Sequence, residues 1–261
     1  GRADQYIHSA LVYNDSEPGV STPVLIPAYH GYTRPMSTLY MVATPIGNLQ
    51  DITLRALETL KSVDTVACED TRHTLKLLTH FEIRKPLVAC YAYEEEKGAR
   101  RILGLLDAGK DVAYCSDAGT PVLSDPGALA ASRAREAGHA VIPVPGPSAF
   151  SALLSVAGFP IKSALFEGFL SPKPGRRRSR LRELLDRGQG FVVYESPHRI
   201  LRLLTDLAEL EPACRVFVGR EMTKAFEEYL SGTAEGVRIE LVGRQKMLGE
   251  FSVLVYGGKK A

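Results

Sequence analysis

The chain has 261 residues, of which 45% are hydrophobic and 24% charged, and its 32 basic and 30 acidic side chains leave a net charge of +2. This length is enough for one large domain or two ordinary ones. The balanced charge excludes nucleic-acid binding through global basicity, so any such contact needs a local patch. No apolar run approaches the ~20 residues that span a bilayer, and the N-terminus lacks a basic-then-apolar signal. We therefore expect a soluble, cytoplasmic protein.

The cysteines and histidines suggest no disulfide framework and no metal site. None of the cysteines forms a CxxC pair, and three of the four lie inside apolar, strand-like runs. We expect them to be buried, reduced thiols that pack as small hydrophobic groups. The six histidines are scattered without ligand spacing, so no metal is expected.

Residues 1–35 differ in composition from the rest of the chain. They hold four prolines and four tyrosines and show no helical period, and Met36 follows them. This N-terminal extension is predicted to be non-native, as a cloning remnant or an over-long start assignment, or poorly ordered. A genuine extension that folds onto the body or onto a partner is the alternative.

Residues 36–160 are predicted to form an α/β domain. Apolar strand-like runs alternate with helical periods, which indicates a mostly parallel sheet covered on both faces. Asp51 is expected to cap a helix through Lys61, and Asp125-Pro126 to open a helix that Gly138 closes. Further helices are expected over residues 71–81, around Ile102, Leu105 and Leu106, and from Ser148 to Gly158. The five expected strands are Leu39–Thr44, Thr65–Asp70, Pro86–Tyr93, Asp111–Asp117 and Ala140–Val144.

Beyond a boundary near residues 158–163, residues 161–261 are predicted to form a mixed-sheet α+β domain of four or five strands. Two helices are expected, Arg178–Arg187 and Pro197–Leu210, the second with Ser196 as N-cap and an apolar stripe. The stretch Thr223–Leu241 is interpreted as an antiparallel pair. The other strands are expected at Ala164–Leu170, Gly190–Glu195, Arg215–Glu221 and Glu250–Tyr256.

Four strand ends carry small-residue or proline turns. In an open α/β sheet, ligands bind outside the carboxyl ends of the strands, and glycine lets the backbone approach them closely. Four such turns favour a ligand site over the alternative of well-made connections. No G-x-G-x-x-G follows the first strand and no P-loop occurs, so a dinucleotide or nucleoside triphosphate site is not supported. The turns are ATPIGNL (43–49), SDAGTP (116–121), PGPSA (145–149) and ESPHR (195–199).

The chain carries a series of seven motifs: TPIGNLQDIT (44–53), ACEDTRHT (67–74), SDAGTP, PGPSA, FEGFL (166–170), YESPHR (194–199) and GREMTK (219–224). Over about residues 38–257, this series resembles the ribosomal RNA small subunit methyltransferase I family of the tetrapyrrole methylase superfamily. The resemblance implies two α/β domains with S-adenosylmethionine in the cleft between them, and a homodimer. It also implies methyl transfer to the ribose 2′-hydroxyl of a cytidine in the 16S rRNA of the small (30S) ribosomal subunit.

The resemblance also implies which residues bind the cofactor. The SDAGTP turn is expected to line its methionine side, the PGPSA turn its adenosine, and the later motifs the opposite wall of the cleft. These residues are Pro45, Gly119, Thr120, Pro121, Ser148, Ala149, Glu167, Ser196, Pro197 and Thr223.

The nucleophile is the difficult part of the reaction, because a sulfonium methyl is already activated whereas a ribose hydroxyl is a weak acid. A positioned base contributes on the order of 10²–10⁴-fold. The EDTRH segment offers Glu69, Asp70 and Arg72 as catalytic candidates. The alternative is structural, with Asp70 capping the following helix and Glu69 paired with Arg72.

An RNA contact is predicted for KPGRRRSRLR (173–182), which holds six basic residues in ten. Such side chains bind phosphates, whereas a solvated basic helix start is the alternative. The residues predicted to contact RNA are Lys173, Arg176, Arg177, Arg178 and Arg180.

Two other functions fit the same motifs. One is methylation of a small tetrapyrrole-like acceptor, and the other is a non-catalytic assembly factor that binds cofactor and RNA. Many members of the family that the chain resembles continue into a small helical domain, whereas this sequence stops at GEFSVLVYGGKKA. We expect either a naturally shorter member or a cut chain.

Overall fold

A computed structural model describes residues 37–158, 162–244 and 246–256. The predicted extension over residues 1–35 lies outside the described residues, as does part of the predicted boundary near residues 158–163. Residues 35–261 form one compact unit. In the described part of the chain, no helix has both the length and the apolar character needed to cross a membrane.

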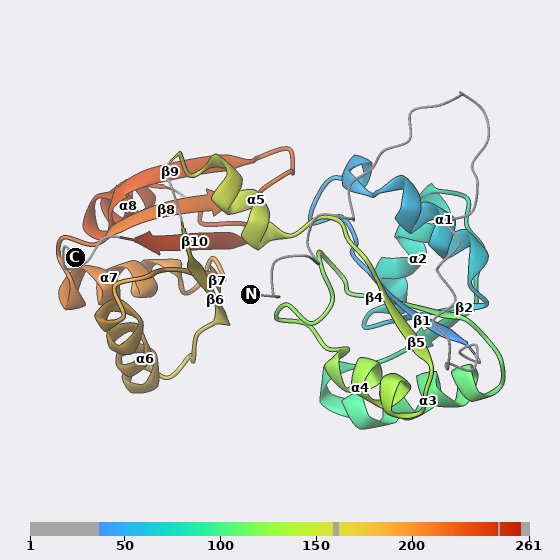
Figure 1. The fold of residues 1–261 in the computed structure, drawn as a ribbon. Helices are drawn as coiled ribbons and strands as arrows, with labels where there is room; N and C mark the ends of the chain where they lie inside the picture. The colour runs from blue at the N-terminus through green and yellow to red at the C-terminus, as the bar shows by residue number, and fades with distance from the viewer. Residues whose placement is uncertain (1–36, 159–161, 245, 257–261) are drawn as a thin grey trace, which may run out of the picture. The chain divides into compact units, whose positions relative to one another are not determined.

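The first sheet has five strands in the order β3-β2-β4-β1-β5, and all neighbours are parallel (Figure 1). All five predicted strands are confirmed, although the third is shorter than expected. Because the strands are parallel, their carboxyl ends and the loops that follow meet at one edge. The strands are β1 (Thr38–Val42), β2 (Thr65–Cys68), β3 (Leu87–Ala89), β4 (Val112–Cys115) and β5 (Ala140–Val144).

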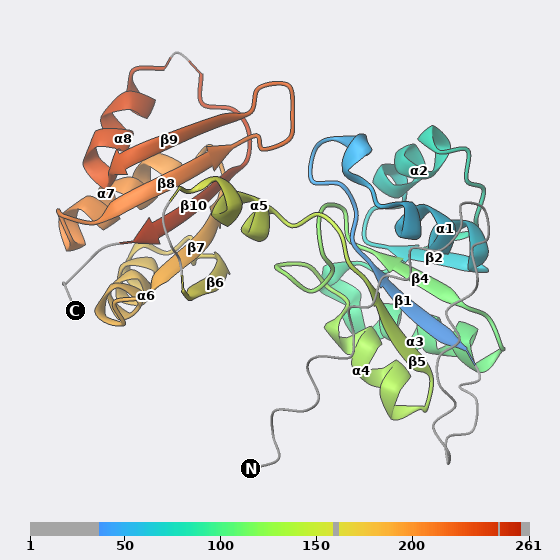
Figure 2. The ribbon, with the colours of Figure 1, turned by 45° about the horizontal axis from the view of Figure 1, so that its top comes forward.

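Two helices cover each face of this sheet (Figures 1 and 2). The first two pack with Ala56, Leu60 and Leu78 against one face, whereas Ile102 and Leu106 of the third pack against the other. Each strand is therefore buried on both sides, which explains its nearly continuous apolar sequence. The helices are α1 (Leu54–Ser62), α2 (Thr71–His80), α3 (Glu95–Asp107) and α4 (Ala128–Glu136).

Two predicted caps of the helices that cover this sheet are wrong. Thr53, not Asp51, caps α1, because its hydroxyl accepts a hydrogen bond from the Ala56 amide at 3.1 Å. Gly127, not Asp125, precedes α4, with φ 123°. A Cβ at Gly127 would lie 2.8 Å from the Tyr114 ring, so the chain must turn past this ring before the helix begins. Asp125 is thereby left outside the helix.

The second sheet is mixed, as predicted, with strand order β6-β7-β10-β8-β9. Only β6 and β7 are parallel neighbours. The antiparallel pair predicted within Thr223–Leu241 is wrong, because that stretch holds one strand and then helix α8 (Ala234–Val242), which Thr233 caps. The strands are β6 (Ala164–Phe169), β7 (Gly190–Glu195), β8 (Arg215–Arg220), β9 (Glu228–Thr233) and β10 (Phe251–Tyr256).

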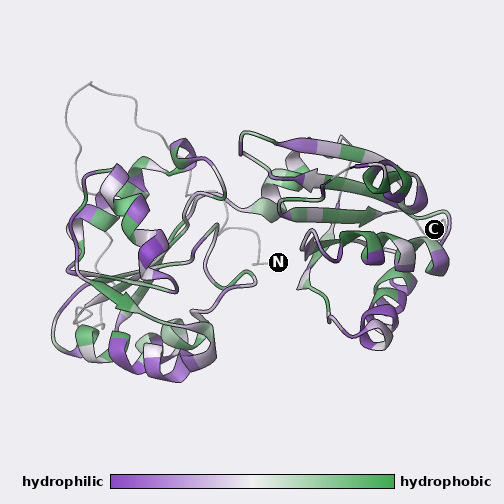
Figure 3. Cartoon of the chain, turned by 180° about the vertical axis from the view of Figure 1, so that it is seen from behind, coloured by the Kyte–Doolittle hydropathy of each residue, from purple (hydrophilic) through white to green (hydrophobic). Residues whose placement is uncertain are grey.

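Helices α6 (Pro174–Asp186), α7 (Ile200–Leu210) and α8 cover one face of the second sheet. The other face receives α5 (Ala149–Val156), whose fully buried Leu153 packs with the sheet residues Val192, Phe217 and Leu254. Helix α5 follows β5, the last strand of the first sheet along the chain, but it packs on the second sheet. Figure 3 shows hydrophobic residues predominating on the central strands of both sheets.

The predicted start of α7 is also wrong. Arg199 occupies the N-cap position, while Ser196 and Pro197 lie in the preceding turn. The prediction for the cysteines is confirmed, since all four are buried free thiols. The α/β class, with a parallel sheet followed by a mixed sheet, is confirmed as well.

Candidate active site

A cavity of about 390 Å³ lies at the carboxyl edge of the first sheet and is closed by residues of the second. Its volume falls within the usual range of small-molecule sites, about 300–1,000 Å³. Apolar and charged side chains share the lining, so the cavity suits a ligand with both an apolar and an ionic part. The lining residues are Ile46, Asp117–Thr120, Leu123–Asp125, Ser148, Ala149, Phe169, Tyr194–Pro197, Met222, Lys224 and Glu250–Ser252.

Hydrogen bonds between backbone and side chains tie the strand-end turns of the first sheet together. Thr44 and Gly119 exchange two backbone hydrogen bonds, at 2.9 and 3.0 Å, across an isolated antiparallel bridge. The Thr120 hydroxyl donates to the Pro147 carbonyl at 3.2 Å. Gly119 has φ 81°, and a Cβ there would contact Ile46 on the cavity wall. The SDAGTP turn is small because it must lie close to two neighbouring turns and still leave space beside them.

Backbone strain concentrates around the cavity. Four of the five described non-glycine residues with positive φ flank it, namely Val122, Ser124, Glu221 and Thr223. Val122 and Thr223 are β-branched, a residue type for which this conformation is least favourable. Each such residue costs on the order of 1–3 kcal/mol, and strain of this kind is typical of ligand sites.

Polar groups without a protein partner also occur here. Among the described residues, Thr223 Oγ1 is one of two buried side-chain atoms that lack a hydrogen-bond partner. Ser148 precedes α5, but its side chain does not cap the helix. The Ser148 hydroxyl therefore remains available to a bound group.

The loop after β4 makes the cavity acidic. Asp117 and Asp125 line it, and Glu69 at the end of β2 interacts electrostatically with both. Burial, reinforced by the charges of Glu69 and Asp117, raises the pKa of Asp125 to about 7. Burial raises the pKa of Glu69 as well. A cationic ligand would relieve the repulsion among these carboxylates.

The second sheet supplies a wall whose charges are paired. Glu195 is buried and bonded to the Arg199 guanidinium at 2.7 Å and to the Ser196 amide at 2.8 Å. Lys224 donates to Glu221 at 2.9 Å and to Glu250 at 3.0 Å. Among the described lining residues, the carboxylates without a cationic partner are thus those on the first-sheet side, Asp117 and Asp125.

Six of the ten predicted cofactor residues line the cavity: Gly119, Thr120, Ser148, Ala149, Ser196 and Pro197. Pro45 and Pro121 are buried behind it, and Glu167 is bonded to Arg180 at 2.7 Å. Thr223 is not among the lining residues, although its neighbours Met222 and Lys224 are.

Sequence reasoning missed Asp125 and the start of β10. Asp125 was interpreted as a helix cap because it precedes proline, and nothing local distinguishes that role from a cavity wall. Glu250–Ser252 line the cavity because β10 pairs between β7 and β8, and its N-terminal end therefore lies beside the turn after β7. That neighbourhood is a property of the sheet order and has no local signal.

The structural alternative describes Asp70 and Arg72. Asp70 is the N-cap of α2 and accepts from the Arg72 amide at 2.8 Å, and its carboxylate binds the Arg72 guanidinium. Hydrogen bonds from Arg72 hold the pKa of Asp70 well below its usual range. Neither residue lines the cavity. Glu69 forms no ion pair with Arg72 among the described contacts and instead interacts electrostatically with Asp117 and Asp125.

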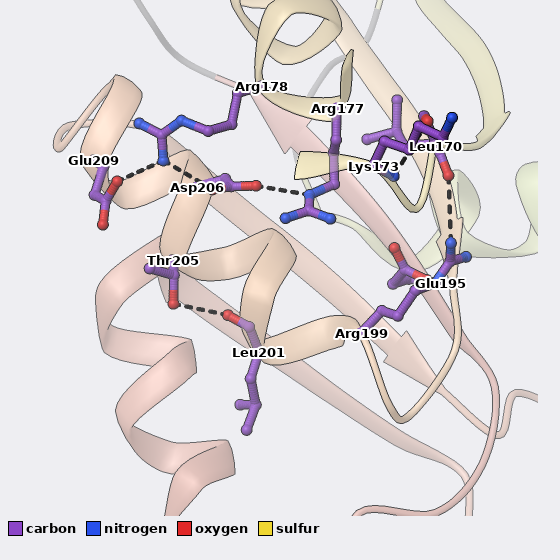
Figure 4. A network of polar contacts seen from close by, with 11 residues as sticks. Leu170, Lys173, Arg177, Arg178, Glu195, Arg199, Leu201, Thr205, Asp206 and Glu209 are labelled. Carbon is purple, nitrogen blue, oxygen red and sulfur yellow. Dashed lines mark hydrogen bonds and ion pairs between the residues drawn. The ribbon is translucent and has the colours of Figure 1, made fainter. Parts of the chain in front are cut away.

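Helix α6 uses most of its predicted RNA-binding arginines internally (Figure 4). Arg177 is buried, and its guanidinium binds Asp206 at 2.7 Å, so this side chain is not available to a phosphate. Arg178 bridges Asp206 and Glu209, and Arg180 binds Glu167 and Glu183. Three basic residues of segment 173–182 are exposed and form no ion pair among the described residues, namely Lys173, Arg176 and Arg182.

Comparison with known sequences identifies close relatives. The family model "Tetrapyrrole (Corrin/Porphyrin) Methylases" matches residues 38–237. The chain is similar to the ribosomal RNA small subunit methyltransferase I of Borrelia garinii subsp. bavariensis, 46% identical over 83% of this chain and 97% of the relative. The Thermotoga maritima protein of that name is 43% identical over 85% of this chain and 99% of the relative. Because these two relatives are matched nearly whole, a further helical domain is not common to all curated members.

Solved structures share the fold at low sequence identity. The X-ray structure of cobalt precorrin-4 methyltransferase, a cobalamin biosynthetic enzyme, superposes with a TM-score of 0.60 at 16% identity, over 85% of this chain and 95% of that one. Uroporphyrin III C-methyltransferase from Thermus thermophilus gives 0.60 at 19% identity, over 83% and 96%. The chain therefore belongs to the tetrapyrrole methylases and, among them, to the ribosomal RNA small subunit methyltransferase I family of S-adenosylmethionine-dependent enzymes.

Proposed function

We propose that the protein transfers a methyl group from S-adenosylmethionine to the ribose 2′-hydroxyl of a cytidine in 16S rRNA, within the cytoplasm. Sequence identity of 43–47% to rRNA methyltransferases over more than four fifths of the chain supports the RNA class of substrate. The single observation that carries the proposal is the acidic cavity at the carboxyl edge of the first sheet, with its strained loop and unpaired polar groups.

The residues of the cavity fit S-adenosylmethionine. The cofactor carries a sulfonium and an ammonium, and the carboxylate of Asp117 provides complementary charge. Its polar groups match the Ser148 hydroxyl, which lines the cavity and does not cap α5. When bound, the cofactor supplies an activated methyl group, and the role left to the protein is alignment. Pro45, Pro121 and Glu167 would then support the lining rather than touch the cofactor.

We assign the hydroxyl proton to Asp125 rather than to Asp70. Asp125 lines the cavity, and no ion pair or hydrogen bond of its carboxylate is found among the described residues. Its pKa of about 7 lies near the working pH, where a general base is most effective. Glu69 and Asp117 act as positioning residues, since their charges keep this pKa raised. Asp70 holds the start of α2 in place.

Phosphates of the substrate are proposed to contact Lys173, Arg176 and Arg182, because these residues are exposed and form no ion pair among the described residues. The family relationship further supports a homodimer. Light scattering at micromolar concentration tests this directly, and a monomer would contradict it.

The decisive experiment is methyl transfer from labelled S-adenosylmethionine to small ribosomal subunits that lack the modification, with free rRNA in parallel. We expect label on one cytidine, in a product resistant to alkaline cleavage at that position, as a 2′-O-methyl group requires. Label on a base instead of a ribose would refute the proposed atom while keeping the substrate class. No label, on a sample that binds the cofactor, would refute the RNA function.

A tetrapyrrole-like acceptor is the second candidate. The two fold relatives act on such compounds by name, but at 16–19% identity they support only the shared fold. Transfer to uroporphyrin III under the same conditions would favour this candidate.

A further inference from the structure

Two tyrosine rings are stacked on the surface next to the candidate active site. Tyr91 and Tyr93 flank the start of a short 3₁₀ turn (Ala92–Glu94) that follows β3. Their ring centroids are 5.2 Å apart, and the planes differ by 10°. Tyr91 is 38% exposed and Tyr93 80% exposed. The outer ring therefore presents a free aromatic face to solvent.

The ring pair is not part of a hydrophobic core. The other parallel stack of rings in the described structure, Phe217 with Tyr229, lies on the second sheet, and Phe217 is only 8% exposed. Neither Tyr91 nor Tyr93 belongs to a described core cluster. Packing thus explains the Phe217 stack but not an ordered tyrosine pair in solvent, which buries little apolar area of its own.

The pair lies at the edge of the sheet that carries the cavity. Ala89 is level with Cys68 of β2, and Cys68 is level with Cys115 of β4. Tyr91 is two residues beyond Ala89, as Asp70 and Asp117 are beyond their own strand ends. With strands about 4.8 Å apart, the backbone at Tyr91 is roughly 10 Å across the edge from that at Asp117. A nucleotide adjacent to one bound in the cavity reaches this distance.

The acidic residues around the pair are already paired. The three glutamates that follow Tyr93 each have partners in the described structure. Glu94 binds Lys97 at 3.2 Å, Glu95 accepts from the Gly127 amide at 3.1 Å, and Glu96 binds Arg133 at 3.2 Å. Glu94 and Glu96 are thus paired with cations, which reduces the repulsion of an approaching polyanion.

Two guanidinium groups stand beside the rings instead. Arg72 has an 87% exposed side chain, and its charge interacts with Tyr91. Arg101 is exposed and donates to the Ala89 carbonyl at 3.1 Å, immediately before the turn that carries the rings. Guanidiniums near exposed aromatic faces are what single-stranded nucleic-acid sites combine, with phosphates on the cations and bases on the rings.

We propose that Tyr93, supported from behind by Tyr91, stacks an unpaired nucleobase of the RNA substrate next to the target nucleotide. This inference rests on the proposed function, because it presumes that the acceptor is RNA. It assigns Arg101, which has no ion-pair partner among the described residues, to a neighbouring phosphate. Arg72 stays in its ion pair with Asp70.

The chain contains no tryptophan, which makes a direct test possible. Tyr93→Trp introduces a single tryptophan at the proposed stacking position, and its indole can be excited selectively over the tyrosines. Titration with a single-stranded oligocytidine of about ten nucleotides, within the usual site size, is expected to quench its emission saturably. Tyr93→Ala should weaken binding of the same oligonucleotide by about 5- to 100-fold, as loss of one stacked base does. Tyr93→Phe should bind like the wild type, because it keeps the ring.

Leu54→Ala is the matched control, since Leu54 is 79% exposed but lies at the start of α1 and has no ring. The inference is overturned if Tyr93→Ala binds the oligocytidine as tightly as the wild type. It is also overturned if sedimentation shows that Tyr93→Ala has a different oligomeric state from the wild type. Methyl transfer to small subunits separates the two proposals. If the wild type methylates rRNA and Tyr93→Ala does so equally well, only the stacking inference fails. If the wild type methylates no rRNA, the proposed function fails, and the stacking inference, which presumes an RNA acceptor, fails with it.

Discussion

The loop after β4 and the basic helix α6 are both polar segments that the sequence predicts to be functional. They differ in whether their charged side chains have partners within the protein. In the loop, the Asp125 carboxylate has no ion pair or hydrogen bond among the described residues, and Val122 and Ser124 are strained. In the helix, Arg177 and Arg178 are bonded to acids within the protein (Figure 4), as is Arg180. Charge density therefore does not identify a binding surface, whereas unpaired polar groups and strain do.

Asp125→Asn tests the loop side of this contrast most strongly. Loss of the proton acceptor should lower the single-turnover rate of methyl transfer by about 10²–10⁴-fold. Cofactor affinity, measured by calorimetry, should change far less than the rate. Asp186→Asn, an exposed acid at the end of α6, is the control and should react like the wild type. A normal rate in Asp125→Asn would remove this residue from the mechanism.

Asp206→Ala tests the helix side. The side chains of Arg177 and Asp206 are 5% and 9% exposed, so the substitution leaves a buried guanidinium without its partner. We expect the free energy of unfolding to fall by about 3–5 kcal/mol, measured by urea denaturation. Arg178→Ala removes a more exposed member of the same network and should cost much less. If Asp206→Ala instead weakens RNA binding without loss of stability, the network is functional and not structural.

The exposed cations of the helix give a smaller effect. Replacing Lys173, Arg176 and Arg182 together by alanine should lower the salt slope of RNA binding by about 2, because each contact to a single strand contributes about 0.7. Filter binding at several salt concentrations measures this slope. An unchanged slope would move the RNA path away from α6 altogether.

The smallest expected effect is a shift of the pH profile in Glu69→Gln. Asp125 accepts a proton only as a carboxylate, so the wild-type rate should fall as the pH drops through about 7. Glu69 and Asp117 both raise the pKa of Asp125, and Asp125 in turn interacts with Tyr114 and Tyr194. Removing the charge of Glu69 lowers the pKa of Asp125, so activity should persist to lower pH. If the midpoint of the pH profile stays in place in Glu69→Gln, and also in the parallel variant Asp117→Asn, this coupling is excluded.

The strands and helices of this protein follow from local pattern to a large extent. Short apolar runs identify all five strands of the parallel sheet, because burial on both faces demands continuous hydrophobicity. The turns SDAGTP and PGPSA identify the cavity edge for a related reason. Only residues without bulk fit where three strand-end loops meet at Thr44, Gly119 and Pro147.

The tertiary structure decided what the polar residues do. Asp125-Pro126 and Ser196-Pro197 both predict a helix start, yet each helix begins later and Asp125, Ser196 and Pro197 line the cavity. For Asp125 the cause is the Tyr114 ring of β4 beside Gly127, a tertiary contact that has no local sequence signal.

The basic helix teaches the same lesson from the other side. Its composition determined that it would be charged, but only the packing of α6 on α7 brings Asp206 and Glu209 within reach of its arginines. A sequence determines which residues can be charged, strained or small. Which of them remain unpaired depends on long-range contacts, and those unpaired groups define the site.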